Sequence, residues 1–149
     1  MPEITLPAKL ESVGKAMIFI KQNLLDLKLA HLAGKVELAV EELLLNVINY
    51  AYNTEFEPSK KKDLKILVGC RLVNLDGVEQ FCVWLRDWGL PFDPFKEVAT
   101  PDISLSVEER EIGGLGVHLV KNVSSHYMYS GSDGSNTVEL YFRLDEAQA

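Results

Sequence analysis

The sequence predicts an α+β protein: a two-layer α/β sandwich in which a mixed, mostly antiparallel sheet is covered on one face by helices. Helical and strand periodicities follow one another along the chain in the order α, α, β, β, α, β, β. Each expected pair of strands also surrounds an Asp-Gly dipeptide, which is typical of a tight hairpin. With 149 residues, of which 47% are hydrophobic, the chain is most simply one domain covering residues 1–149.

The first half of the chain is predicted to form a short strand and two helices. The strand covers Ile4–Leu6, and apolar residues recur at helical spacing from Lys9 to about Leu27. A second helix is expected from about His31 to Tyr52. Its core-facing stripe is expected to contain Val36, Val40, Leu44, Val47 and Ala51.

The second half is predicted to form two hairpins around a third helix. Apolar and polar residues alternate from Leu64 to Leu72, and Asp76-Gly77 is expected to turn the chain into a return strand that ends at Asp87. By strand parity, Asp87 lies on the same face as the apolar set Phe81, Val83 and Leu85. The third helix is expected around residues 117–123, followed by strands at about 126–131 and 137–144 that flank Asp133-Gly134.

Composition excludes several classes of protein. The net charge of −7 and the lack of a Lys/Arg face argue against nucleic-acid binding, because phosphate contacts need such a face. The apolar runs are too short for a membrane span, and the start of the chain has no signal-peptide pattern, so a cytosolic location is expected. Cys70 and Cys82 are expected to be buried without a disulfide, and the three scattered histidines, His31, His118 and His126, to have structural or surface roles.

The most informative segment is a polar stripe in the second helix. At about 100° per residue, Glu42, Asn46, Asn49 and Asn53 fall on one side of this helix, opposite its apolar stripe. Glu41 instead points towards water. Because buried polar groups are costly, the stripe is interpreted as the wall of a ligand site, in which Glu42 and Asn46 could share one metal-bound ligand.

A second candidate segment follows the return strand, at Asp87-Trp88-Gly89-Leu90-Pro91-Phe92-Asp93-Pro94. Its first residue could accept a hydrogen bond from an exocyclic amine, and Gly89 would let the backbone approach a ligand. Taken alone, an aspartate at a strand end is more often a turn cap.

A third candidate segment is the glycine cluster before the last helix. Gly113, Gly114 and Gly116 would expose backbone N–H groups at the positive end of the helix dipole, which suits phosphate oxygens. The segment lacks the Gly-Lys-Ser/Thr ending of a Walker loop, and no strand leads directly into a dinucleotide fingerprint. Plain helix-entry loops can look the same.

Together, in this order and spacing, the three segments resemble the sequence boxes of the Bergerat-fold (GHKL) ATP-binding superfamily. The resemblance runs from about Leu10 to Leu144 and is closest to the small anti-sigma-factor serine kinases of the RsbW type. Glu42 and Asn46 match the E-x-x-x-N core of the first box. The second box is matched by residues 87–93, and the third by Gly114-Leu115-Gly116 with Leu119-Val120-Lys121.

The resemblance implies a role for each matched residue. Glu42 would be the catalytic general base, Asn46 the Mg²⁺ ligand, and Asp87 the acceptor for the adenine amine. Residues from about Pro94 to Ile112 would form a mobile lid. The remaining expected nucleotide contacts are Asn49, Gly89, Arg110, Gly113, Gly114, Leu115, Gly116 and Lys121, of which Lys121 could equally be a surface lysine.

The implied function is that of an ATP- and Mg²⁺-dependent protein-serine/threonine kinase. It would phosphorylate a STAS-type antagonist protein, sequester a sigma factor and form a homodimer. Pro91 stands where many superfamily members have a second glycine, so the lid hinge is expected to be stiffer here. Two alternatives stay open: a binding module that uses nucleotide only to change its affinity for a partner, and a plain ATP hydrolase.

Overall fold

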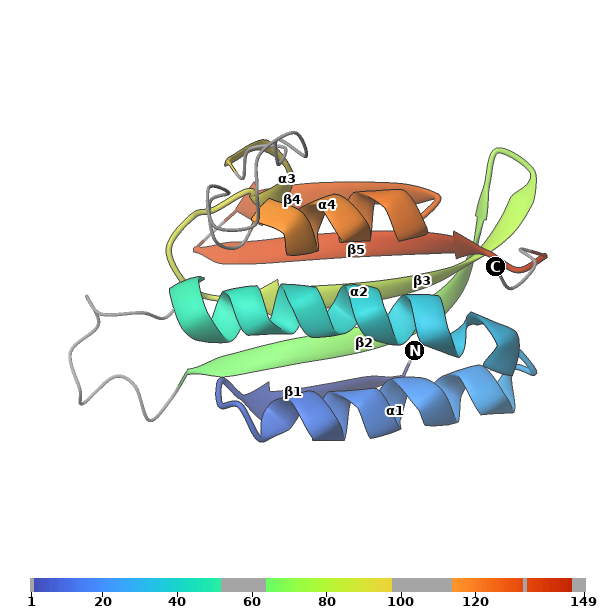
Figure 1. The fold of residues 1–149 in the computed structure, drawn as a ribbon, viewed down its shortest axis with the longest axis horizontal. Helices are drawn as coiled ribbons and strands as arrows, with labels where there is room; N and C mark the ends of the chain where they lie inside the picture. Colours follow the sequence, from blue (N-terminus) through green and yellow to red (C-terminus); the bar gives the residue numbers. More distant parts are fainter. Residues whose placement is uncertain (1, 52–63, 98–113, 133, 146–149) are drawn as a thin grey trace.

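The computed structural model describes residues 2–51, 64–97, 114–132 and 134–145 (Figure 1). Among these residues, no helix is both long and apolar enough to cross a bilayer. The elements along the chain are β1 (Glu3–Pro7), α1 (Ser12–Asp26), a 3₁₀ turn η1 (Ala30–Leu32), α2 (Ala33–Asn46), a π-helical turn η2 (Val47–Ala51), β2 (Lys65–Leu75), β3 (Val78–Asp87), α3 (Pro94–Glu97), α4 (Gly114–Val123), β4 (His126–Ser132) and β5 (Ser135–Arg143).

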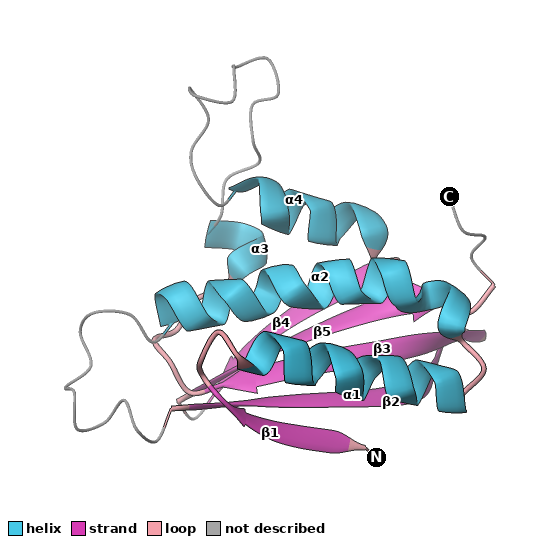
Figure 2. Ribbon diagram, turned by 60° about the horizontal axis from the view of Figure 1, so that its bottom comes forward, coloured by secondary structure: helices cyan, strands magenta, loops and turns pink. Residues whose placement is uncertain are grey.

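The strands form a single sheet in the order β1-β2-β3-β5-β4. Helices α1, α2 and α4 lie in a layer over one face of it, with α2 over its centre (Figures 1 and 2). The predicted sandwich with helices on one face is therefore confirmed. Every pairing between the described strands is antiparallel, so the sheet is more uniform than the mixed sheet that was expected.

The main core lies between the helices and the inner face of the sheet. Phe81, Val83 and Leu85 all belong to it, as strand parity predicted. Cys82 and Trp84 instead pack with Tyr141 in a smaller cluster on the outer face. The two cysteines are free, and since Cys70 belongs to the inner core and Cys82 to the outer cluster, they lie on opposite faces of the sheet.

The predicted hairpin at Asp76-Gly77 is confirmed. Leu75 pairs directly with Val78, which leaves a two-residue loop. Both loop residues have positive φ, 51° at Asp76 and 86° at Gly77, as a type I′ turn requires. This turn fixes the register of β2 and β3, and it is the register that delivers Asp87 to the inner face opposite Ile66.

The second predicted helix is divided into three parts. It begins with the 3₁₀ turn η1, continues as the regular helix α2, and ends in the π turn η2. The π turn follows directly after Asn46 and has an i→i+5 hydrogen-bond pattern, so the regular angular spacing of α2 stops there. Asn49 lies within this turn and is exposed.

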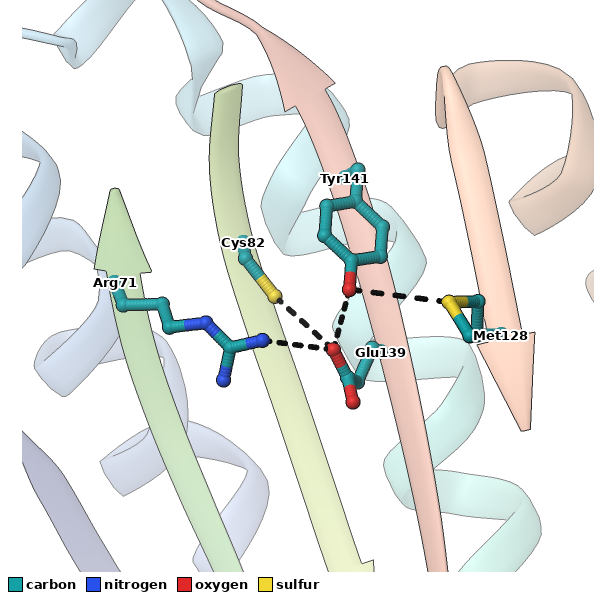
Figure 3. A network of polar contacts seen from close by, with 5 residues as sticks. All are labelled: Arg71, Cys82, Met128, Glu139 and Tyr141. Carbon is teal, nitrogen blue, oxygen red and sulfur yellow. Dashed lines mark hydrogen bonds and ion pairs between the residues drawn. The ribbon is translucent and has the colours of Figure 1, made fainter. Parts of the chain in front are cut away.

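A polar network lies on the outer face of the sheet, away from the helices (Figure 3). The guanidinium of Arg71 lies 2.9 Å from Oε2 of Glu139, and the Tyr141 hydroxyl donates to the same oxygen. The Cys82 sulfur lies 3.9 Å from that oxygen, and burial raises the pKa of its thiol to about 11. The thiol therefore stays protonated at neutral pH, and the network is a structural link between β2, β3 and β5.

Candidate functional site

A narrow cavity lies between α2 and the inner face of the sheet, beside the end of β3. Its volume is about 40 Å³. Asn46 and Asp87, which the sequence assigned to one site, both line it. The complete lining is Leu43, Asn46, Val47, Leu85, Asp87, Phe92, Pro94, Asn136 and Val138.

Asp87 is a buried carboxylate at the bottom of this site, with 7% of its surface exposed. Its Oδ1 accepts hydrogen bonds from the backbone N–H of Gly89, at 2.9 Å, and from the Asn136 amide, at 3.0 Å. Neither bond uses Oδ2, which leaves that oxygen as an acceptor for a ligand. Burial raises the pKa of Asp87, and the two hydrogen bonds only partly oppose this shift.

Asn136 holds this arrangement together, and the sequence analysis missed it. Its amide nitrogen donates to Asp87 and also lies 3.3 Å from the carbonyl oxygen of Gly89 and 3.0 Å from that of Leu90. Its side-chain oxygen accepts from the backbone N–H of Phe92 and from the Tyr129 hydroxyl. In the opposite amide orientation, the side-chain oxygen of Asn136 would face the Asp87 carboxylate and the two backbone carbonyl oxygens, all of which are acceptors. The network therefore fixes the orientation of the side chain.

A signal for Asn136 is present in the sequence. In the last strand it has the same parity as Val138, Leu140 and Phe142, whose side chains pack into the inner core. A carboxamide in register with three core residues breaks the expected pattern of an apolar inner face. Its direct partner across the sheet is Asp87, so strand pairing brings the two polar side chains together.

Glu42 faces the beginning of α4. A Cβ atom placed on Gly116 would lie 2.2 Å from Oε2 of Glu42, so the carboxylate occupies the space that any larger residue would need. The helix dipole of α4 favours a negative charge near this end. Glu42 and Asn46 thus lie one turn apart on α2, with Glu42 against α4 and Asn46 at the cavity. Glu41 is exposed, as predicted.

Lys121 makes a contact that differs from the expected one. Its Nζ donates to the backbone carbonyl of Phe95 at 2.9 Å and lies 5.8 Å from the centre of the Tyr127 ring. The ammonium therefore links α3 to α4.

The other predicted site residues fall into two groups. Gly89 is buried beside Asp87, Gly114 and Leu115 begin α4, and Asn49 is exposed and does not line the cavity. Asn53, Arg110, Gly113 and most of the expected lid, residues 98–112, lie outside the described residues.

The donor set at the site suits a magnesium–nucleotide complex better than a metal held by protein alone. Among the described residues there is no cluster of three or more His, Cys, Asp or Glu side chains that could bind a metal. Mg²⁺ is commonly held by one or two protein oxygens together with substrate phosphates. Asn46 offers a carboxamide oxygen at the cavity, with the Glu42 carboxylate one helical turn away, which fits such partial coordination.

Solved structures that are similar to the chain include the following two. One contains the RsbU and RsbW domains of Rv1364c from Mycobacterium tuberculosis, with a TM-score of 0.57, 14% identity, and coverage of 96% of this chain and 32% of that one. The chain thus spans about a third of the length of that solved chain. The other is the histidine kinase AdeS of Acinetobacter baumannii, with a TM-score of 0.47, 9% identity, and coverage of 98% and 69%. No protein of curated function matches the chain.

A family model described as the histidine kinase-like ATPase domain matches residues 6–142. This range contains the last two residues of β1, all the described helices, the cavity and almost all of β5. The superfamily that the sequence motifs predicted is therefore confirmed. The chain belongs to the histidine kinase-like ATPase domain family.

Proposed function

We propose that the protein is a cytosolic, ATP-dependent protein-serine/threonine kinase that acts as an anti-sigma factor and phosphorylates a STAS-type antagonist. The observation that carries the proposal is that α2 presents two polar residues to two different places, the cavity and the start of α4. Asn46 and the buried Asp87 line one cavity, while Glu42, one turn away, lies against the start of α4. An adenine-binding end and a catalytic end of one site would be arranged in this way. The likeness of the fold to a chain with an RsbW domain supports this branch of the family.

At the adenine end, Asp87 would select the base. Its Oδ2 would accept a hydrogen bond from the exocyclic amine of adenine, because Oδ1 is already engaged by Gly89 and Asn136. Guanine carries a carbonyl oxygen at the corresponding position and would meet the carboxylate with a second acceptor. The site is therefore expected to prefer ATP over GTP.

At the catalytic end, Glu42 would accept the proton of the attacking serine or threonine hydroxyl. The hydroxyl oxygen forms a bond to the γ-phosphorus as the bond to the β–γ bridging oxygen breaks, and ADP leaves. Asn46 would hold Mg²⁺, which when bound neutralises charge on the phosphate oxygens. The remaining contribution of the protein is positioning of the two reactants.

Incubation with γ-labelled ATP and a candidate antagonist tests the proposal. Label on the antagonist indicates a kinase, free phosphate indicates a hydrolase, and neither product indicates a nucleotide-switched module. We expect Glu42→Ala to lower phosphotransfer by at least about 100-fold while ATP binding persists, since general base catalysis contributes about that much. Glu41→Ala is the matched control because Glu41 is the exposed neighbour on the same helix. Equal activity of both variants would contradict the role of Glu42.

The proposal also includes a sigma factor as the sequestered partner and a homodimer as the assembly. Light scattering on the purified protein tests the dimer. Co-purification with sigma factors from the native host, followed by mass spectrometry, tests the partner. A monomer that retains none of them would favour the plain hydrolase.

A further inference from the structure

A tyrosine of the edge strand β4 contacts the oxygen side of the buried Asn136 amide. The side-chain oxygen accepts two hydrogen bonds, one from the Tyr129 hydroxyl at 2.5 Å and one from the Phe92 N–H at 3.3 Å. The first distance is usual for an O–H donor, whereas the second is longer than is typical for an N–H donor. Tyr129 therefore supplies the main donor to this oxygen.

The pairing of β4 with β5 explains how Tyr129 reaches Asn136. Gly131 is the direct partner of Asn136, and Tyr129 is opposite Val138. Tyr129 and Gly131 share a face of the sheet because they are two residues apart. Diagonal neighbours across a strand pair are about 7–8 Å apart, which an aromatic side chain can span. The Tyr129 ring must therefore extend along its strand, past Gly131, to meet Asn136.

Gly131 leaves the space that this contact requires. A Cβ atom on Gly131 would lie 2.6 Å from the hydroxyl oxygen of Tyr129 and 3.2 Å from its Cζ. The φ angle of Gly131 is not positive, so the glycine provides space here and no special backbone conformation. A larger residue at this position would push the hydroxyl away from Asn136.

The nitrogen side of Asn136 connects this contact to the carboxylate of the candidate site. The amide donates to Oδ1 of Asp87 at 3.0 Å, and Asn136 and Asp87 both line the cavity. Tyr129 does not line it, but lines a separate pocket of about 330 Å³ that Asn136 also borders. An effect of Tyr129 on a base in the cavity would therefore be transmitted through Asn136.

We propose that Tyr129 is a positioning residue for base recognition: its hydroxyl fixes the Asn136 amide, which in turn holds the Asp87 carboxylate in place for the amine of adenine. The inference rests on the proposed function insofar as it takes the base to be adenine. Without the hydroxyl, the Asn136 oxygen keeps only the longer bond from Phe92, and the amide can turn away from Asp87. Of its two hydrogen bonds, Oδ1 of Asp87 then keeps the one from Gly89.

Purine riboside, which is adenosine without its exocyclic amine, separates this role from a general structural one. Only the affinity of adenosine includes the amine contact with Asp87. We expect Tyr129→Phe to lower the ratio of the two affinities, adenosine over purine riboside, by about 2- to 10-fold, which corresponds to one hydrogen bond. Tyr127→Phe is the matched control, because it removes a hydroxyl from an exposed tyrosine of the same strand. Calorimetric titration measures both affinities.

Gly131→Ala should lower the ratio in the same way, because the methyl group would displace the Tyr129 hydroxyl. In the double variant Tyr129→Phe/Gly131→Ala the ratio should fall no further than in Tyr129→Phe alone, since the hydroxyl is already absent. A ratio in Tyr129→Phe equal to that of the native protein would overturn the inference, whether or not the two affinities themselves had changed.

Hydrogen exchange without any ligand gives a second readout. The amides of Gly89 and Phe92, which donate to Asp87 and Asn136, should exchange faster in Tyr129→Phe, while those of α1 keep their native rates. Tyr127→Phe should leave all of these rates unchanged. If the native protein bound neither nucleoside, the proposed function would fail, and exchange would still decide whether Tyr129 positions Asn136. Native rates at both amides in Tyr129→Phe would then refute that role.

Discussion

At the scale of single residues, Gly116 shows how one missing side chain can position another. Glycine is permissive of unusual backbone angles, but Gly116 lies inside the regular helix α4. What it provides there is space, since its Cβ would come within 2.2 Å of Oε2 and 2.9 Å of Cδ of Glu42. The end of a glutamate side chain is flexible, so a larger residue would displace the carboxylate without breaking the packing of the backbone.

We expect Gly116→Ala to separate activity from stability. Alanine favours a helix over glycine by about 0.5–1 kcal/mol, so the melting temperature should not fall. Phosphotransfer should fall by about 100-fold, because small displacements of a catalytic group are that costly. Gly14→Ala is the matched control: Gly14 is likewise the third residue of its helix, α1, but a Cβ there would meet nothing within 4 Å.

The double variant Glu42→Ala/Gly116→Ala then shows whether Gly116 acts through Glu42. If it does, the second substitution adds nothing to the effect of the first, because groups acting as a unit are not additive. A further loss of activity in the double variant, or weaker ATP binding by Gly116→Ala alone, would mean that this glycine acts on the phosphates directly.

At the scale of elements, the outer face of the sheet depends on a close contact between β2 and β3. Gly69 pairs with Trp84, and a Cβ on Gly69 would lie only 2.1 Å from Cζ2 of the indole. The ring therefore lies directly over the glycine. Among the described residues, Nε1 of Trp84 is the one buried side-chain polar atom without a hydrogen-bond partner. The indole is instead held by its close packing on Gly69.

We expect Gly69→Ala to lower the free energy of unfolding by about 1–3 kcal/mol, as overpacking typically does. Adding Trp84→Leu should recover part of this loss, since a smaller side chain can make room for the new methyl group. Urea unfolding followed by circular dichroism gives the four free energies of the double-mutant cycle. Additive effects would show that Gly69 is needed for some reason other than the indole.

Elements that rest on local periodicity could be predicted from the sequence, whereas features that rest on tertiary pairing could not. Alternation and the Asp76-Gly77 turn gave β2 and β3, together with the correct face for Asp87. The π turn after Asn46 was missed because nothing in the stripe distinguishes it from a regular helix.

The candidate site follows the same division. Asn46 and Asp87 could be assigned to one site from sequence motifs, and they do line one cavity. Asn136 was missed because its importance lies in pairing with Asp87, 49 positions away in the chain. The contact of Lys121 with Phe95 likewise depends on where α3 lies against α4. Such contacts form only when the helices and the sheet pack together, so local sequence patterns do not predict them.

At the scale of the whole molecule, the burial of Asp87 lowers the stability of the fold but provides the proposed contact with adenine. The carboxylate is nearly buried, and desolvation raises its pKa in the folded state above that in the unfolded chain. A group of this kind contributes stability that is fully present below its unfolded pKa and is lost as the pH rises through its folded pKa. Burial thus destabilises the ionised form of Asp87, which is the form that the proposed adenine contact requires.

We expect Asp87→Asn to remove this part of the pH dependence. The variant and the native protein should unfold with similar free energies at a pH below the unfolded pKa, where both carry a neutral side chain at this position. As the pH rises, the native protein should lose stability relative to the variant, which at pH 7 should be equally or more stable. The amide would place a donor where Oδ2 lay, so adenosine should bind roughly 10- to 100-fold more weakly. Urea unfolding at several pH values, with calorimetric titration of adenosine at pH 7, measures both effects. The contrary result would be a variant whose stability, relative to the native protein, is lower at pH 7 than at acidic pH. It would mean that the ionised carboxylate stabilises the fold, which contradicts the conflict between stability and adenine recognition.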